Sequence, residues 1–288
     1  MEKKAFCQFQ AVLLRGGSVS EPEITSLQNP RVKQVLALRD RRDRDKTGLF
    51  IIEGYRELLR ALEGQWKIDI LFYCPSLFLG SNEGALIQRI AAHGGKTLEC
   101  SPAVFQKLSY RDRPDGLVGI APKKSESFSE FTQNLAEKKN PFLVVAEAIE
   151  KPGNLGTILR SSDAVALDGL IVCDRCTDIY NPNVVRASVG TLFTVPVVEA
   201  KGEETLQWLK SQGIAILAAT PSAEKEFTQV DMRGPLAIAV GTEQLGLSER
   251  WMKNADLQVR IPMHGVADSL NVAMATTLLL YEALRQRC

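Results

Sequence analysis

Three short segments in the second half of the chain combine glycines with side chains that can hold a ligand. They are EKPGNLGTILR at 150–160, GTEQLGLS at 241–248 and IPMHGVADSLN at 261–271. Glycine lets the backbone approach a ligand closely, while amide, carboxylate and guanidinium groups offer hydrogen bonds and charge. Taken singly, each segment also fits an ordinary turn or helix start, with Asn154 and either Ser269 or Asn271 as N-cap residues.

Each of these segments follows or overlaps an apolar run that predicts a strand. The runs lie at 142–146, 236–240 and 257–261, and similar runs lie at 169–173, 194–198 and 214–218. Helical segments lie between most of them, which predicts a largely parallel sheet covered on both faces. Ligands of such sheets bind at the carboxyl ends of the strands, so we expect the three segments to meet at one edge.

The third segment leads directly into a long apolar helix. Residues 272–284 carry no charge before Glu282. A helix that is apolar around its whole circumference must be covered by the core or by a second subunit. The sequence therefore predicts a buried C-terminal helix and leaves both ways of covering it open.

The first half of the chain predicts a smaller α/β domain at 21–122. Strands are expected at 48–52, 69–73 and 96–99, with helices at 31–46, 55–63 and 84–92. A flexible extension is expected at 1–20, and a linker with a short amphipathic helix at 123–140. The remaining residues, 141–288, form the second domain.

The expected helix at 31–46 is strongly basic. Seven Lys/Arg against three Asp give it a net charge of +4. Such a face is either simply solvated or contacts nucleic-acid phosphates, and both interpretations remain open. The arginines that would make the phosphate contacts are Arg39, Arg41, Arg42 and Arg44.

Composition excludes several other classes of site. The net charge is only +1, with 45% apolar and 24% charged residues, which is typical of a soluble globular protein. Cys173 and Cys176 form a CxxC with no second pair, so we interpret them as reduced thiols and expect no metal. The longest uncharged run near the C-terminus falls short of the roughly 20 residues of a membrane span, and no signal peptide is evident, so we expect a cytoplasmic protein.

Taken together and in this order, the three segments resemble the motifs of the SpoU (TrmH-like) RNA 2′-O-ribose methyltransferases. The matching patterns are NxGxxxR at 154–160, GxExxG at 241–246, and IPM followed by SLNVA at 269–273. The stretch YNPNVVRASVGTLF at 180–193 also resembles the family. The resemblance covers about residues 142–286, and residues 24–120 more loosely resemble the family's substrate-binding domain, which is related to RNA-binding ribosomal proteins.

The resemblance implies a SPOUT fold, a parallel sheet with flanking helices whose C-terminal segment forms a trefoil knot. It implies a homodimer formed through the C-terminal domain, with S-adenosylmethionine as cofactor. The implied reaction is methyl transfer to a ribose 2′-hydroxyl of structured RNA. The additional N-terminal domain favours ribosomal RNA over transfer RNA.

Roles for individual residues follow from the same resemblance. The cofactor would be held by Gly241, Leu245, Gly246, Ile261, Met263 and Leu270. The catalytic set would be Arg160, Asn154, Glu243, Ser269 and Asn271, with Arg186 as a further phosphate contact. A guanidinium stays protonated, so Arg160 is expected to grip a phosphate and stabilise the developing oxyanion, not to act as a base.

Three alternatives stay open at this point. The protein could be a tRNA 2′-O-methyltransferase, or a non-catalytic RNA-binding protein of the same fold. It could also be a Rossmann-type enzyme that uses a nucleotide, but no GxGxxG fingerprint follows any early strand. Binding of S-adenosylmethionine separates the enzyme from the non-catalytic protein.

Overall fold

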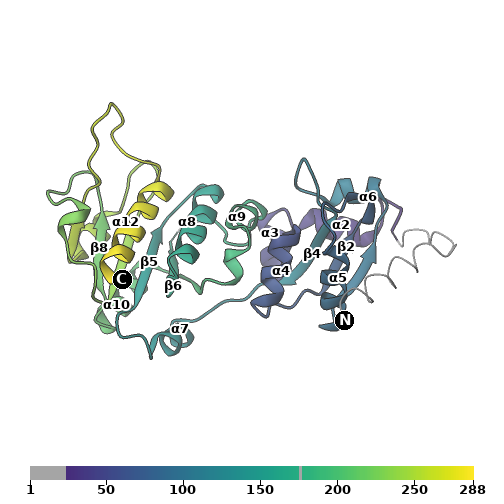
Figure 1. Cartoon of the computed structure of the whole chain (residues 1–288), viewed down its shortest axis with the longest axis horizontal. Coiled ribbons are helices and arrows are strands. Elements are labelled where there is room, and N and C mark those ends of the chain that lie inside the picture. Colours follow the sequence, from purple (N-terminus) through teal and green to yellow (C-terminus); the bar gives the residue numbers. More distant parts are fainter. Residues whose placement is uncertain (1–23, 175–176) are drawn as a thin grey trace.

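The structure, a computed structural model, describes residues 24–174 and 177–288. The predicted extension at 1–20 and Cys176 of the CxxC pair lie outside this part of the chain. The described residues form two α/β units, one built on each of two sheets, that meet at a narrow waist (Figure 1).

The first sheet has four strands in the order β1-β4-β2-β3. Strands β1 and β2 both pair antiparallel with β4, while β2 and β3 are parallel. The strands are β1 Leu49–Glu53, β2 Ile70–Tyr73, β3 Lys96–Glu99 and β4 Leu117–Pro122. The helices are α2 Pro30–Ala37, α3 Arg41–Thr47, α4 Tyr55–Glu63, α5 Glu83–Ala92 and α6 Pro102–Leu108.

The second sheet has six strands in the order β10-β8-β9-β5-β6-β7, and every pairing is parallel. The strands are β5 Phe142–Glu147, β6 Gly169–Cys173, β7 Val197–Ala200, β8 Ala215–Ala219, β9 Leu236–Val240 and β10 Leu257–Val259. The helices are α7 Phe128–Leu135, α8 Pro152–Ala164, α9 Pro182–Ser188, α10 Gly202–Ser211, α11 Glu249–Asn254 and α12 Val272–Arg287. The predicted α/β class, with a parallel sheet and flanking helices, is confirmed.

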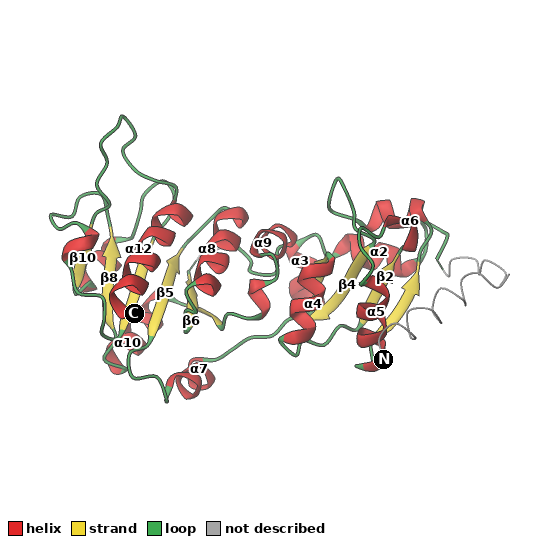
Figure 2. Ribbon diagram, in the orientation of Figure 1, coloured by secondary structure: helices red, strands yellow, loops and turns green. Residues whose placement is uncertain are grey.

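The six-stranded sheet is covered on both faces, as its uninterrupted apolar runs predict. Successive side chains of a strand point to opposite faces, so Val144 and Val145 enter different cores. Val144 packs with residues of α8 and α12, and Val145 with residues of α7, α10 and α11. Figure 2 shows α8 and α12 side by side over one face of the sheet.

Three elements of the first unit differ from the sequence prediction, and one of them is helix α6, which was not predicted. The single helix expected at 31–46 is two helices, because Asp40 caps a new one and accepts a 2.8 Å hydrogen bond from the Arg42 amide. The strand β4 was missed, although it lies at the centre of the sheet. Its sequence, LVGIAP, contains glycine and ends in proline, which weakens the strand pattern.

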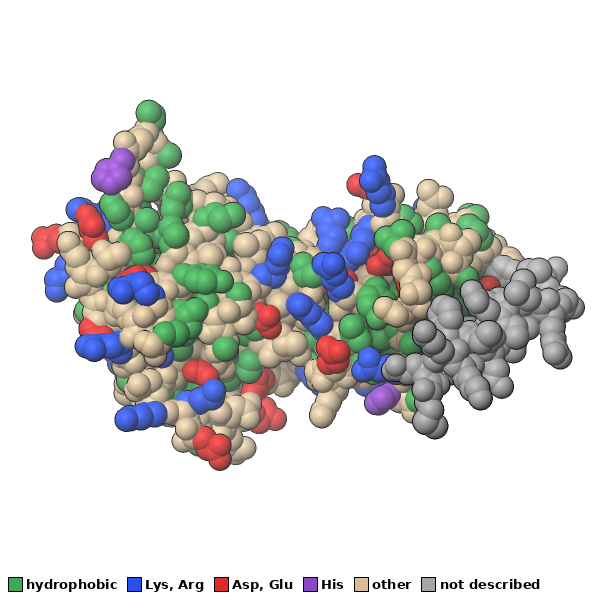
Figure 3. All heavy atoms as spheres, in the orientation of Figure 1, with side chains coloured by type: hydrophobic (Ala, Val, Ile, Leu, Met, Phe, Trp, Pro, Cys, Tyr) green, Lys and Arg blue, Asp and Glu red, His purple; other side chains and the backbone are tan. Residues whose placement is uncertain are grey.

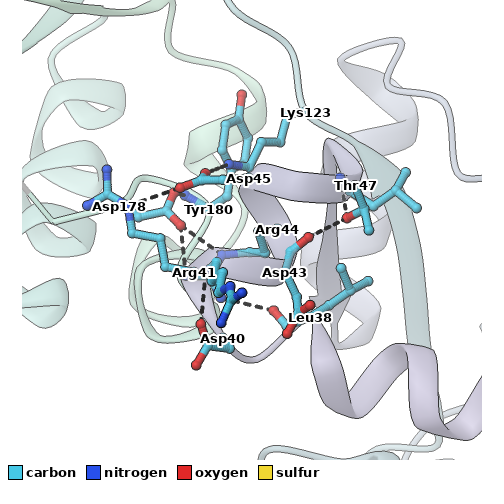
Figure 4. Close-up of polar contacts among 12 residues, drawn as sticks. Leu38, Asp40, Arg41, Asp43, Arg44, Asp45, Thr47, Lys123, Asp178 and Tyr180 are labelled. Atoms are coloured by element: carbon cyan, nitrogen blue, oxygen red, sulfur yellow. Dashed lines mark hydrogen bonds and ion pairs between the residues drawn. The ribbon is translucent and has the colours of Figure 1, made fainter.

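The two units share apolar and polar contacts at the waist. The ring of Phe50 on β1 lies 4.6 Å from that of Tyr180, which precedes α9, and both belong to one apolar cluster. Beside them the buried Arg44 contacts the carboxylate of Asp178 at 2.7 Å (Figure 4). The two units are therefore joined by a packed interface as well as by the linker.

Among the described residues, no helix is long and apolar enough to cross a membrane.

Candidate active site and cofactor cavity

The three sequence segments meet at the carboxyl ends of β5, β9 and β10, as the parallel arrangement requires. A cavity of about 560 Å³ lies between the second and third segments. Its lining includes all six predicted cofactor contacts, Gly241, Leu245, Gly246, Ile261, Met263 and Leu270. It also includes three of the predicted catalytic residues, Glu243, Ser269 and Asn271.

Asn154 connects the three segments by hydrogen bonds. Its Nδ2 donates to Oε1 of Glu243 at 2.6 Å, and its Oδ1 accepts from Nδ2 of Asn271 at 3.1 Å. Asn271 also caps α12, since its Oδ1 accepts from the amide of Ala273 at 2.9 Å. One buried side chain thus holds residues that are about 90 and 120 positions away in the chain.

The expectation that Asn154 is the N-cap of α8 is wrong. The helix begins at Pro152, and its N-cap residue, Lys151, makes no side-chain capping bond. The cap comes from another loop, because Glu243 accepts from the amides of Glu150 at 3.3 Å and Lys151 at 3.2 Å. A carboxylate at a helix N-terminus is also favoured by the helix dipole.

These contacts keep Glu243 ionised. Partial burial opposes ionisation, but the hydrogen bonds from the Asn154 side chain and from the two backbone amides outweigh it and lower the pKa of Glu243. Every one of these donors belongs to the first segment. The geometry therefore fits Glu243 as a residue that positions Asn154 and the start of α8, not as a proton acceptor.

The second segment folds tightly back on itself. The backbone groups of Thr242 and Gly246 exchange two 3.0 Å hydrogen bonds, and Gly246 has a φ of +70°. A Cβ atom on Gly241 would lie 2.2 Å from the carbonyl of Gly246, so only glycine fits there. Leu245 at the tip is 89% exposed and faces the open side of the cavity.

The cavity contains one wall that the sequence analysis missed. Residues 220–222, directly after β8, line it together with Ala219, the last residue of that strand. Strand β8 lies between β9 and β10, so its carboxyl end opens at the same edge. Because ligands bind at the carboxyl ends of parallel strands, this loop could have been predicted in the same way as the others. It was overlooked because the sequence around Thr220 and Ser222 contains no recognisable motif.

Arg160 lies apart from the cavity. It is exposed on α8, two turns beyond Asn154, and is not among the cavity-lining residues. Its side chain makes no hydrogen bond or ion pair with any residue that the structure describes. Its neighbour Ser161 bonds to Thr277 of α12 at 2.6 Å, which places Arg160 beside the C-terminal helix.

The predicted phosphate-binding arginines separate into three groups. Arg44 is only 1% exposed and bound to Asp178, so its assignment to RNA binding is wrong in this fold. Arg39 donates to the carbonyls of residues 107–109 and supports that loop. Arg41, Arg42 and Arg186 are exposed, although Arg41 lies 3.5 Å from Asp45.

Within residues 24–174 and 177–288, no three His, Cys, Asp or Glu side chains lie close enough together to hold a metal ion.

Two regions of the chain match known protein families. Residues 141–281 match the SpoU rRNA Methylase family, and residues 29–119 match the MRM3-like substrate binding domain. A curated relative is 30% identical over 273 residues, which is 92% of each chain. The chain belongs to the SpoU rRNA methylase family. The resemblance predicted from the three motifs is confirmed, and so is the assignment of the chain as a methyltransferase.

That SpoU relative is the 23S rRNA (uridine(2479)-2′-O)-methyltransferase of Streptomyces viridochromogenes. Among solved structures, the AdoMet-bound rRNA methyltransferase of Sinorhizobium meliloti is 32% identical, with a TM-score of 0.82 over 91% of this chain and 97% of that one. A structure described as an RNA 2′-O ribose methyltransferase is 40% identical, with a TM-score of 0.79 over 92% and 98%. Both matched regions of this chain, 29–119 and 141–281, thus have counterparts of known fold.

Proposed function

We propose that this SpoU-family protein transfers a methyl group from S-adenosylmethionine to a ribose 2′-hydroxyl of ribosomal RNA. The observation that carries the proposal is the junction of the three motifs, in which Asn154 bonds both Glu243 and Asn271 beside one cavity. The relative from Streptomyces viridochromogenes is named for 2′-O-methylation of 23S rRNA, which supports the same substrate class.

The cavity fits S-adenosylmethionine in size and in chemistry. Its volume of about 560 Å³ lies within the range of small-molecule sites. Six apolar side chains suited to an adenine ring line it, namely Val240, Leu247, Met252, Val259, Ile261 and Val272. When bound, the cofactor supplies an electrophilic methyl group on a cationic sulfur.

The protein's own residues then have to hold and orient the reacting ribose. Ser269 and Asn271 line the cavity with a hydroxyl and an amide that can bond sugar oxygens. Asn154 and Glu243 fix the loops from which these groups project. The cationic Arg160 grips the phosphate of the target nucleotide and stabilises negative charge that develops on the 2′-oxygen.

We further propose that two copies form a homodimer through α12. Four apolar side chains stand exposed on or next to this helix: Leu270 at 38%, Met274 at 57%, Leu278 at 42% and Tyr281 at 50%. Their spacing puts them along one stripe of the helix. A second copy packed on that stripe would approach Arg160, because α12 and α8 are bonded together at Ser161.

Two other expectations from the family resemblance stay proposals. The trefoil knot is one, and the third segment between β10 and α12 is the part of the chain that would form it. A cytoplasmic site of action is the other, and it follows from ribosomal RNA as the substrate.

The proposal is tested by methyl transfer from tritiated S-adenosylmethionine to deproteinised bacterial 23S rRNA, with bulk tRNA as the competing substrate. We expect label in a 2′-O-methylated nucleotide of the rRNA. Arg160→Ala should reduce transfer at least a hundredfold and leave the Kd for S-adenosylmethionine unchanged, in line with the usual cost of losing a charge-stabilising group. Label in tRNA alone would show that tRNA, not rRNA, is the substrate. Normal turnover by Arg160→Ala would refute the role of that residue.

A further inference from the structure

A second groove, separate from the cofactor cavity, lies at the waist between the two units. Its volume is about 860 Å³, and it is bounded by α4, the loop at 109–115 and α9. Three exposed arginines line it, namely Arg56 on α4, Arg113 on the loop and Arg186 on α9. Figure 3 shows Lys and Arg side chains gathered where the two units meet.

The carboxylates of this groove are already used inside the protein. Glu57 is 4% exposed and pairs with Arg111 at 2.6 Å, and the buried Asp115 accepts from the amide of Tyr55 at 2.9 Å. Glu83, also 4% exposed, accepts from the amide of Gly80 at 2.7 Å. All three carboxylates are buried, and Arg111 pairs with two of them, Glu57 and Asp115, so the charged side chains that reach solvent in the groove are mainly arginines.

The solvent-facing charge of the groove is therefore positive. Only one of its exposed side chains, Asp112, is acidic, against three exposed arginines, which leaves an excess of two positive charges. Arg56 and Arg113 make no ion pair or hydrogen bond with any described residue. Arg186 donates only to the amide oxygen of Asn183, at 3.1 Å. All three guanidinium groups can bind an anionic group.

The groove is held in shape by a buried carboxylate from β1. Glu53 accepts from the Ser109 hydroxyl at 2.5 Å and from the Tyr110 amide at 2.8 Å, which anchors the loop that carries Arg113. Gly54, with φ of +113°, leaves room for the Arg111 guanidinium, which a Cβ atom would approach to 2.6 Å. The arginines of the groove thus project from a fixed frame.

Hydrogen bonds and packing also connect the groove across the waist to the catalytic unit. Asn183 on α9 donates to the hydroxyl of Tyr110 at 3.1 Å and accepts from Arg186. Helix α9 in turn packs so closely on α8 that a Cβ on Gly156 would lie 2.4 Å from the Cβ of Ala187. The groove and the helix that carries Asn154 and Arg160 therefore belong to one packed assembly.

We propose that this groove binds the phosphodiester backbone of the RNA substrate through Arg56, Arg113 and Arg186. Guanidinium groups match phosphate oxygens in geometry and charge, and these three exposed arginines line one groove. The inference rests on the proposed function for its substrate class. It keeps Arg186, which the sequence already offered as a phosphate contact, and places the main RNA contact at the waist instead of on α3, which was one of two open interpretations.

The test compares the triple variant Arg56→Ala, Arg113→Ala, Arg186→Ala with a charge-matched control, Arg89→Ala, Arg233→Ala, Lys253→Ala. The control removes three exposed cations from elsewhere on the surface. Binding of deproteinised 23S rRNA is measured at several salt concentrations, and binding of S-adenosylmethionine is measured in parallel. A third variant, Arg41→Ala with Arg42→Ala, tests the α3 face.

We expect the groove variant to bind rRNA about tenfold more weakly or worse at physiological salt, and its salt slope to fall by roughly two to three. Its KM for RNA should rise while kcat at saturating RNA and the Kd for S-adenosylmethionine stay unchanged. The control should resemble wild type. A groove variant with the wild-type salt slope, or a larger loss in the α3 variant, would overturn the inference. Failure of the proposed function has a different signature, namely wild-type protein that does not bind S-adenosylmethionine.

Discussion

At the scale of single residues, the site depends on side chains that position other residues through hydrogen bonds and ion pairs. The edge rule for parallel sheets correctly predicted that the three segments meet, and the residues that the family resemblance assigned to the cofactor line one cavity there, although residues 219–222 of its lining were missed. It was wrong about Asn154 as a cap and Arg44 as an RNA contact. The partners of both, Glu243 and Asp178, lie 89 and 134 positions away, so no local pattern could reveal them.

Glu243 gives a pH-dependent prediction at this scale. Its folded-state pKa lies below the ordinary 4.5, so its contribution to stability is present above pH 4.5 and is lost as pH falls through the lower folded value. Glu243→Gln should therefore be less stable than wild type at pH 7, and the gap should close below pH 4.5. Urea unfolding at pH 7 and at a pH below 4.5 measures the difference in stability between the variant and wild type, with the exposed Glu249→Gln as control. A gap that persists unchanged at low pH would show that Glu243 does not act through its charge.

At the scale of elements, the bounds of helices and strands with a regular apolar period could be predicted from the sequence. The bounds of irregular junctions could not. Helix α4 and strand β9 begin and end where the sequence predicts. Strand β7 was expected at 194–198 but starts at Val197, because the amides of Thr194 and Val195 bond back to the carbonyl of Thr191 in a 3-10 helix. Apolar content marks burial in both conformations, so it does not distinguish a strand from a short turn of helix.

The junction between α3 and the catalytic unit makes a stability prediction. Arg44 is fully satisfied, since its Nε bonds Asp178 at 2.7 Å and its Nη1 bonds the carbonyls of Leu38 and Arg39 at 2.9 and 2.8 Å. Arg44→Met leaves the buried Asp178 charge unpaired and should lower the free energy of unfolding by about 3–5 kcal/mol. The measurement is chemical denaturation.

Two further variants make that experiment decisive. Arg42→Met, on the exposed side of the same helix, should change the free energy of unfolding by less than about 0.5 kcal/mol. Adding Asp178→Leu to Arg44→Met should recover part of the loss, because no buried charge then remains. Equal effects of Arg44→Met and Arg42→Met would mean that the ion pair does not join the two units.

At the scale of the whole molecule, the exposed stripe of α12 was anticipated only in part. The uncharged sequence of 272–281 required a cover, and the structure buries one side of this helix against α8 and the sheet. The other side remains open at Met274, Leu278 and Tyr281. Hydrophobicity alone does not tell a core face from an interface face, and this is why the sequence left both possibilities open.

The proposed dimer predicts the effect of a charge on that stripe. Met274→Glu should convert a dimer to a monomer in light scattering coupled to size exclusion, because a carboxylate would be buried without a partner. Leu79→Glu is the matched control, since Leu79 is 79% exposed in the other unit. Wild-type protein that elutes as a monomer, or a Met274→Glu protein that stays dimeric, would contradict the proposed interface.

The central claim is that the cavity formed by the second and third segments, with Asn154 bonded to both, holds S-adenosylmethionine. Calorimetric titration of the protein with S-adenosylmethionine tests it most directly. Wild type and Gly265→Ala, where an added Cβ meets nothing, should bind one molecule per chain. Gly241→Ala, where the Cβ would lie 2.2 Å from the Gly246 carbonyl, should lose that binding. Absence of binding by wild type, or equal binding by Gly241→Ala, would contradict the account.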